Sequence, residues 1–175
     1  SIGNIITEYG NFDKQYFVNN FLQTKFSNDS LLEIATAKVM QHIVSIHPIW
    51  PKSNFFYFLK KLNILNNQLP DSLKIREYFS NQASWDQISN RKQYDSITKM
   101  NYDSGMAVHA IHYCNLIKKQ SKRKKCLIIT NYSHAFNFQT KSYHSAASYI
   151  FKTFPNTTAN VLLNTMFPIS LHYNY

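Results

Sequence analysis

The side chains best suited to chemistry in this sequence are a histidine and a glutamate that each follow a short apolar run. Residues 125–134 read Lys-Cys-Leu-Ile-Ile-Thr-Asn-Tyr-Ser-His, so the apolar run ends in small polar residues and then His134. Residues 5–11 pass in the same way from isoleucine to Glu8 and then to a glycine. An acid and an imidazole that meet can perform acid–base catalysis or bind a metal ion. The alternative is that each is a solvated loop residue or a helix cap.

The elements that must position these side chains are strands. The continuous apolar run at residues 126–129 favours a strand buried on both faces, as in a parallel sheet. Ligands of open α/β sheets bind beyond the carboxyl ends of such strands. If the runs that precede Glu8 and His134 are parallel strands of one sheet, both side chains emerge at the same edge. A third predicted strand, at residues 73–79, would bring Asn81 to that edge as well.

Helical periodicity fills the sequence between these strands. The apolar spacing predicts helices at residues 13–24, 28–43, 55–67, 96–118 and 145–151, and one further strand at 159–164. Alternation of strands and helices predicts an α/β fold with a mainly parallel central sheet flanked by helices. No repeat or linker interrupts the pattern, so we expect residues 1–175 to form a single domain.

The composition excludes several classes of site. The sequence has only three glycines, and they are far apart. This excludes a dinucleotide-binding fingerprint and a phosphate-binding loop, because both need clustered glycines. No apolar run reaches the length of a transmembrane helix. The two cysteines, Cys114 and Cys126, lack metal-ligand spacing, and we expect buried free thiols rather than a disulfide.

The formal net charge of +10 is concentrated in residues 118–125. A basic run can bind nucleic acid, but here it joins a predicted helix to a predicted strand, which favours a solvated connection. We therefore favour a small-molecule substrate over nucleic acid as the binding partner of this protein.

The predicted helix at 96–118 carries further polar residues. Asp103 suits its first regular turn, where a carboxylate complements the helix dipole. His109 and His112 are three positions apart and could share a ligand on one face. The favoured interpretation is one packed and one exposed histidine, since no third ligand is evident.

The order of these motifs resembles the core of the erythromycin esterase-like family, which belongs to a wider group with Tiki-type metalloproteases and haem-binding uptake proteins. The matching stretches are Ile5–Gly10, Leu69–Arg76, Trp85–Ile88, Asn101–Ala107 and Cys126–His134. The resemblance implies an α/β fold with a cleft at the strand ends, ester-type hydrolysis, and a bacterial protein that the cell could export. It also implies catalytic roles for Glu8 and His134. The substrate-binding residues that it implies are Tyr9, Asn81, Tyr102, Asp103 and Tyr132.

Three differences from that family bear on activity. Tyr102 stands where the family usually has arginine, and Asn81 where relatives often have aspartate. The family also has an earlier strand that ends in an acidic residue and a histidine. Since this sequence begins after that point, we expect a fragment of a larger family core.

Two alternatives to a hydrolase follow from the same residues. A haem- or metal-binding protein of the related uptake branch would use Tyr9, Tyr132 and His134 as iron ligands. A catalytically degenerate member of the family would bind a partner without turnover. A metal ion or haem is therefore the candidate cofactor, although the sequence has no haem-attachment motif.

Overall fold

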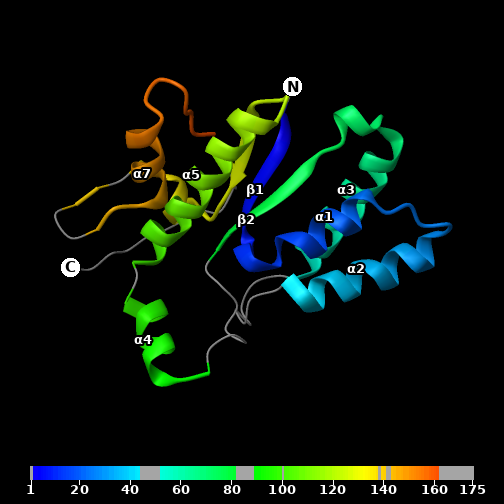
Figure 1. The fold of residues 1–175 in the computed structure, drawn as a ribbon, viewed down its shortest axis with the longest axis horizontal. Helices are drawn as coiled ribbons and strands as arrows, with labels where there is room; N and C mark the ends of the chain where they lie inside the picture. Colours follow the sequence, from blue (N-terminus) through cyan, green and yellow to red (C-terminus); the bar gives the residue numbers. More distant parts are fainter. Residues whose placement is uncertain are drawn as a thin grey trace, which may run out of the picture.

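The computed structural model describes residues 2–43, 52–81, 89–99, 101–137, 139–140 and 143–161. Its described strands are β1 (Ile2–Asn11), β2 (Arg76–Asn81) and β3 (Lys125–Ile129). They form one parallel sheet in the order β2–β1–β3, with helices on both faces (Figure 1). The predicted α/β class and the parallel pairing are confirmed.

Three helices cover one face of the sheet. They are α1 (Gln15–Gln23), α2 (Asp29–Ile43) and α3 (Lys52–Gln68). Because side chains alternate along a strand, Ile5 and Phe79 point toward this layer and join its buried core. All three helices were predicted from apolar spacing, and the side chain of Asn28 caps α2 by accepting a hydrogen bond from the backbone N–H of Leu31 at 2.9 Å.

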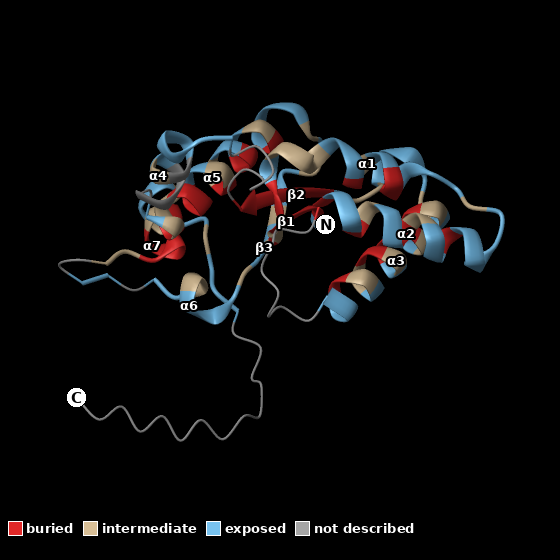
Figure 2. Cartoon of the chain, turned by 90° about the horizontal axis from the view of Figure 1, so that it is seen from below, coloured by how far each residue is buried: buried red, intermediate tan, exposed pale blue. Residues whose placement is uncertain are grey.

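The opposite face is covered by α5 (Tyr102–Gln120) and α7 (Ala146–Thr153). Ile6 and Tyr78 point toward this layer, where they pack among Met106, Ala110 and other buried residues. Figure 2 shows the buried residues along β1, β2 and the inner sides of the helices, with exposed residues outside. The sheet therefore separates two apolar cores.

The register of β1 with β2 shifts near the carboxyl ends of the strands. Thr7 pairs with Phe79, and Asn11 pairs with Asn81. Between these two pairs the chain advances four positions along β1 but only two along β2. The surplus residues form a β-bulge, a feature that redirects side chains and is common beside functional sites. Glu8 therefore lies within β1 at this bulge, and not after the strand as its sequence suggested.

The burial of β3 differs from the prediction. We expected this strand to be buried on both faces, but Leu127 and Ile129 are each 42% exposed. Cys126 and Ile128 pack against the α5 and α7 core, whereas their neighbours face the other side. The prediction was wrong because only one face of β3 is covered. Among the described strands β2 also lies at an edge of the sheet but is buried, and an apolar run does not reveal how far a helical layer extends.

Other boundaries also differ from the prediction. The strand expected from residue 73 begins at Arg76, because Asp71–Leu73 forms a 3-10 turn, η2. The long helix expected at 96–118 is two helices, α4 (Arg91–Lys99) and α5. Residues 159–161 do not form the expected strand, and the rest of that stretch lies outside the described residues.

Candidate active site at the carboxyl ends of the strands

Glu8 lies directly after the last ladder pair of β1 with β3, which joins Thr7 to Ile129. Its side chain is buried, and the backbone N–H of Asn131 donates a hydrogen bond to Oε1 at 2.8 Å. Burial raises the pKa of Glu8, and the charge of Asp103 adds to this, while the Asn131 hydrogen bond and His134 oppose it. Oε2 is buried and receives no hydrogen bond from the described residues.

His134 reaches the same place from the far end of β3. The chain turns after the strand into a short helix, α6 (Tyr132–Ala135), which the Asn131 side chain caps by accepting from the backbone N–H of Ser133 at 3.3 Å. This turn places Nε2 of His134 3.9 Å from Oε2 of Glu8. The predicted convergence of Glu8 and His134 at one edge is therefore present in the structure.

Asp103 completes the cluster from the helical layer that contains α5. It lies in the first turn of α5, where the Asn101 side chain caps the helix by accepting from the backbone N–H of Asp103 at 3.0 Å. Its Oδ1 lies 2.8 Å from Nδ1 of His134 and also accepts from the backbone N–H of Ala146 at 2.8 Å. Because Oδ1 already accepts from the Ala146 N–H, we assign it as the acceptor here too, with Nδ1 as the donor. Asp103 therefore orients the imidazole with Nε2 toward Glu8.

Two tyrosines border this cluster. The Tyr143 hydroxyl donates to Oδ2 of Asp103 at 2.9 Å, and burial together with this hydrogen bond raises the pKa of Tyr143 to about 12. The Tyr102 ring lies 5.5 Å from the His134 ring, centroid to centroid. Burial, followed by the charges of Glu8 and Asp103, raises the pKa of Tyr102, and a hydrogen bond with the Asn81 side chain opposes the shift. Both hydroxyls therefore stay protonated at neutral pH.

The remaining predicted site residues lie outside this hydrogen-bonded cluster. The Tyr9 ring stacks on Phe55 with centroids 3.9 Å apart, on the face opposite α5. Tyr132 is 61% exposed and contacts Phe136. Among the described residues, no group of three or more His, Cys, Asp or Glu side chains could hold a metal ion. The roles of Tyr9 and Tyr132 as substrate-binding residues or iron ligands remain predictions.

His109 and His112 follow the favoured interpretation of the sequence. Nδ1 of His109 lies 3.0 Å from the carbonyl oxygen of Ser80, and its ring stacks on Phe12 with centroids 4.2 Å apart. His112 is exposed and makes an edge contact with Tyr113. One histidine is packed and the other faces solvent.

An apolar cavity of about 380 Å³ adjoins Glu8. Its walls come from the ends of β1 and β3 and from the first turns of α3: Thr7, Glu8, Tyr9, Asn54, Phe55, Phe58, Ile129, Thr130 and Asn131. The cavity exists because the α3 layer does not cover the outer part of β3, which leaves Ile129 facing Phe55 and Phe58 across it. No lysine or arginine is among these residues, so the cavity suits a neutral, apolar group.

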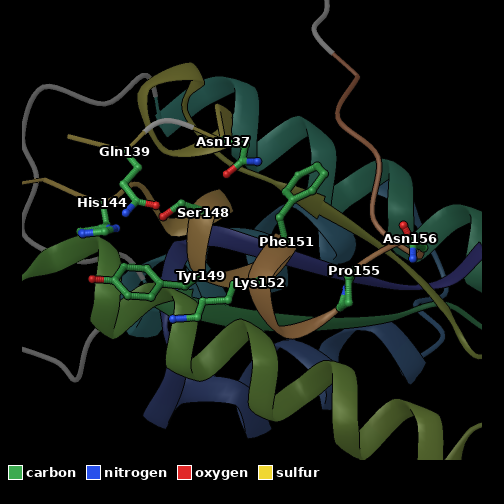
Figure 3. A pocket seen from close by; sticks show the side chains of 9 residues that line it. All are labelled: Asn137, Gln139, His144, Ser148, Tyr149, Phe151, Lys152, Pro155 and Asn156. Atoms are coloured by element: carbon green, nitrogen blue, oxygen red, sulfur yellow. The ribbon is translucent and has the colours of Figure 1, made fainter. Parts of the chain in front are cut away.

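A second cavity, of about 510 Å³, lies along α7 (Figure 3). It is lined by His144, Tyr149, Lys152 and amide side chains such as Asn137 and Asn156. Neither Glu8, Asp103 nor His134 lines it, so it is separate from the acid–base cluster.

Comparisons with protein-family models, with curated proteins and with solved structures found no match to this chain. The resemblance to the erythromycin esterase-like family therefore remains a prediction. Among the described residues, no helix combines the length and apolar character needed to cross a membrane.

Sequence reasoning missed two contributors to the cluster. Asn131 belongs to the Asn-Tyr-Ser motif at the end of β3, and its capping role was a detectable signal. Tyr143 lies in a loop, and nothing around it in the sequence indicates that it reaches Asp103. Only the folded chain brings it there.

Proposed function

We propose that this protein is a hydrolase that cleaves an ester-type bond, with Glu8 and His134 as its catalytic residues. The observation that carries the proposal is the line of side chains Asp103–His134–Glu8, with separations of 2.8 Å and 3.9 Å, beside an apolar cavity. A buried carboxyl group with a raised pKa at the wall of a cavity, as Glu8 is here, is typical of active sites.

Each side chain has a role in this proposal. Glu8 accepts a proton from the attacking water through Oε2, and its raised pKa makes it a stronger base than an exposed glutamate. In this proposal His134 acts as an imidazolium: Nε2 donates to the carbonyl oxygen as negative charge develops on it, and Asp103 stabilises the positive charge of the ring. The proton that Glu8 takes from water then passes to the leaving alkoxide. The spacing of 3.9 Å between Oε2 and Nε2 is wider than a hydrogen bond, so in this proposal the two atoms contact the same reacting group and not one another.

The differences from the resembled family also fit this proposal. The resemblance implies an arginine at position 102 and an aspartate at position 81. The Asn81 side chain lies close enough to influence the Tyr102 hydroxyl, so the two substitutions fall at neighbouring positions. Replacing both charged partners by neutral ones avoids leaving one buried charge unpaired. The hydrogen bond between Asp103 and His134 does not involve this pair.

The haem-binding alternative has less support. The ring of Tyr9 packs in the core against Phe55, and the ring of Tyr132 makes an edge contact with Phe136. A haem titration followed by its absorption band tests this alternative. A saturable shift that disappears in H134A would favour haem binding over hydrolysis.

The test of the hydrolase proposal is turnover of neutral esters by E8Q and H134N variants. We expect p-nitrophenyl esters to be hydrolysed by the native protein, and each variant to lose about 10²-fold or more in kcat. E77Q is the matched control, because Glu77 is also a buried glutamate in the sheet but lies one strand away. Near-native turnover in E8Q, with circular dichroism unchanged, would refute the assignment of Glu8.

A further inference from the structure

The two cysteines meet on the face of the sheet that α5 covers. Cys114 lies in the middle of α5 and Cys126 in β3, and their sulfur atoms are 3.3 Å apart as free thiols. Cys114 is 6% exposed, whereas Cys126 is only partly buried. The fold therefore holds two thiols in contact, one of them closer to solvent.

The surroundings favour a thiolate on Cys126. A hydrogen bond from the Cys114 thiol lowers the pKa of Cys126 to about 7, and the charge of Lys118 contributes in the same direction. The Lys118 ammonium is held over the Phe154 ring, 4.0 Å from its centroid, on the same helix as Cys114. The hydrogen bond with Cys126, followed by burial, raises the pKa of Cys114, so the two thiols differ in reactivity.

We propose that Cys114 and Cys126 form a redox-active dithiol site that reacts with low-molecular-weight disulfides. The Cys126 thiolate attacks one sulfur of the small disulfide, forms a mixed disulfide and releases one thiolate. Cys114 then loses its proton and attacks the Cys126 sulfur, which forms the intramolecular disulfide and releases the second thiolate. The protein gives up two electrons and two protons, and the small disulfide is reduced to two thiols.

Oxidation of the two cysteines would also change how two elements of the fold are connected. Cys114 lies on α5, the helix that carries Asp103, and Cys126 lies on β3, the strand that leads to His134. A disulfide would join these two elements covalently. The site is nevertheless distinct from the acid–base cluster, so its reactivity does not depend on the hydrolase proposal.

The experiment is incubation of the reduced protein with glutathione disulfide at neutral pH, followed by intact-mass and peptide mass spectrometry. We expect the native protein to lose the mass of two hydrogen atoms and to yield a Cys114–Cys126 linked peptide. C114S should instead accumulate a glutathione adduct on Cys126. C126S should react at least ~10-fold more slowly, because Cys114 is buried and remains protonated.

Several outcomes would overturn the proposal. These are glutathione adducts that persist on both cysteines of the native protein, disulfide-linked dimers alone, or no change of mass. Equal rates for C114S and C126S would refute the order of attack. If the serine variants do not fold, the native protein alone can test the proposal. Its equilibrium ratio of intramolecular disulfide to mixed disulfide should be at least ~10-fold lower in denaturant than in the folded state. An unchanged ratio would contradict a preformed site.

Discussion

Nδ1 of His134 lies 2.8 Å from Oδ1 of Asp103, which joins a residue after β3 to the first turn of α5. The two residues are separated by 31 positions in the sequence, and the carboxylate is 3% exposed. Asp103 also accepts hydrogen bonds from the backbone of Ala146 and from Tyr143. This carboxylate therefore connects three segments of the chain at the candidate site.

The first prediction concerns Asp103 as the residue that orients His134. In D103N the amide cannot support the imidazolium, so we expect ester turnover to fall ~10²-fold or more, through kcat rather than KM. We also expect the free energy of unfolding to fall by about 1–3 kcal/mol, because asparagine replaces one of the two acceptor oxygens of Asp103 by an NH2 donor and leaves part of this buried hydrogen bonding without an acceptor. Y143F is the control, since it removes one hydrogen bond to Asp103 and leaves His134 in place. A D103N protein with native kcat contradicts the orienting role.

The second prediction concerns Glu77, a fully buried carboxyl in β2. Its Oε1 accepts from the Thr7 hydroxyl at 3.1 Å, and burial raises its pKa to about 8. Between the ordinary value of 4.5 and about 8, the folded protein keeps a proton that the unfolded chain releases. The free energy of unfolding should therefore fall as pH rises through this window, by at most about 1.4 kcal/mol per pH unit.

E77Q should flatten this decline, because glutamine cannot titrate and keeps the oxygen that accepts from Thr7. Urea unfolding at several pH values across the window measures the effect. E33Q is the matched control, since Glu33 is exposed on α2 and should leave the slope unchanged. A wild-type stability that rises across the same window would contradict the buried, protonated state of Glu77.

The third prediction concerns the hydrogen bond between the two thiols. C114A removes the donor that lowers the pKa of Cys126, so the pH midpoint for alkylation of Cys126 should move upward from about 7. C114S retains a hydroxyl donor and should move the midpoint less. The measurement is the rate of iodoacetamide alkylation against pH. Identical profiles for the native protein and C114A would show that Cys114 does not support the thiolate.

The fourth prediction concerns Gly10, which lies in the bulged part of β1. A Cβ at this position would come within 2.7 Å of the Phe79 ring, which is completely buried. G10A should therefore destabilise the protein by about 1–3 kcal/mol through overpacking. G3A is the comparison, because a Cβ there meets the Arg123 side chain, which can move aside at lower cost. Thermal or urea unfolding of both variants distinguishes the two, and equal losses would contradict the prediction.

Much of the fold could be predicted because its signals are local. Apolar spacing identified α1, α2, α3 and α7, and the apolar runs identified the strands, whose parallel pairing then placed Glu8 and His134 at one edge. The exposure of β3 could not be predicted in this way. It depends on which strands the α1–α3 layer covers, and that is a property of the tertiary arrangement.

The candidate site was predictable in part for a similar reason. The sequence placed Glu8 and His134 at strand ends and Asp103 at a helix start, because each position has a local signature. The order Asp103–His134–Glu8 arises from packing between α5 and α6, which no short stretch encodes. The contacts from Tyr143 and Ala146 to Asp103 likewise depend on distant segments.

The bulge in β1 has a consequence for how such a site can be gained or lost. Between the Thr7 and Asn11 ladder positions, β1 exceeds β2 by an even number of residues. Because side chains alternate with a period of two, an even insertion leaves every later residue on its original face. A dipeptide such as Glu8–Tyr9 could therefore enter or leave the strand without inverting the core beyond it. A buried carboxylate at this position is therefore compatible with an unchanged alternation of side chains in the rest of the strand.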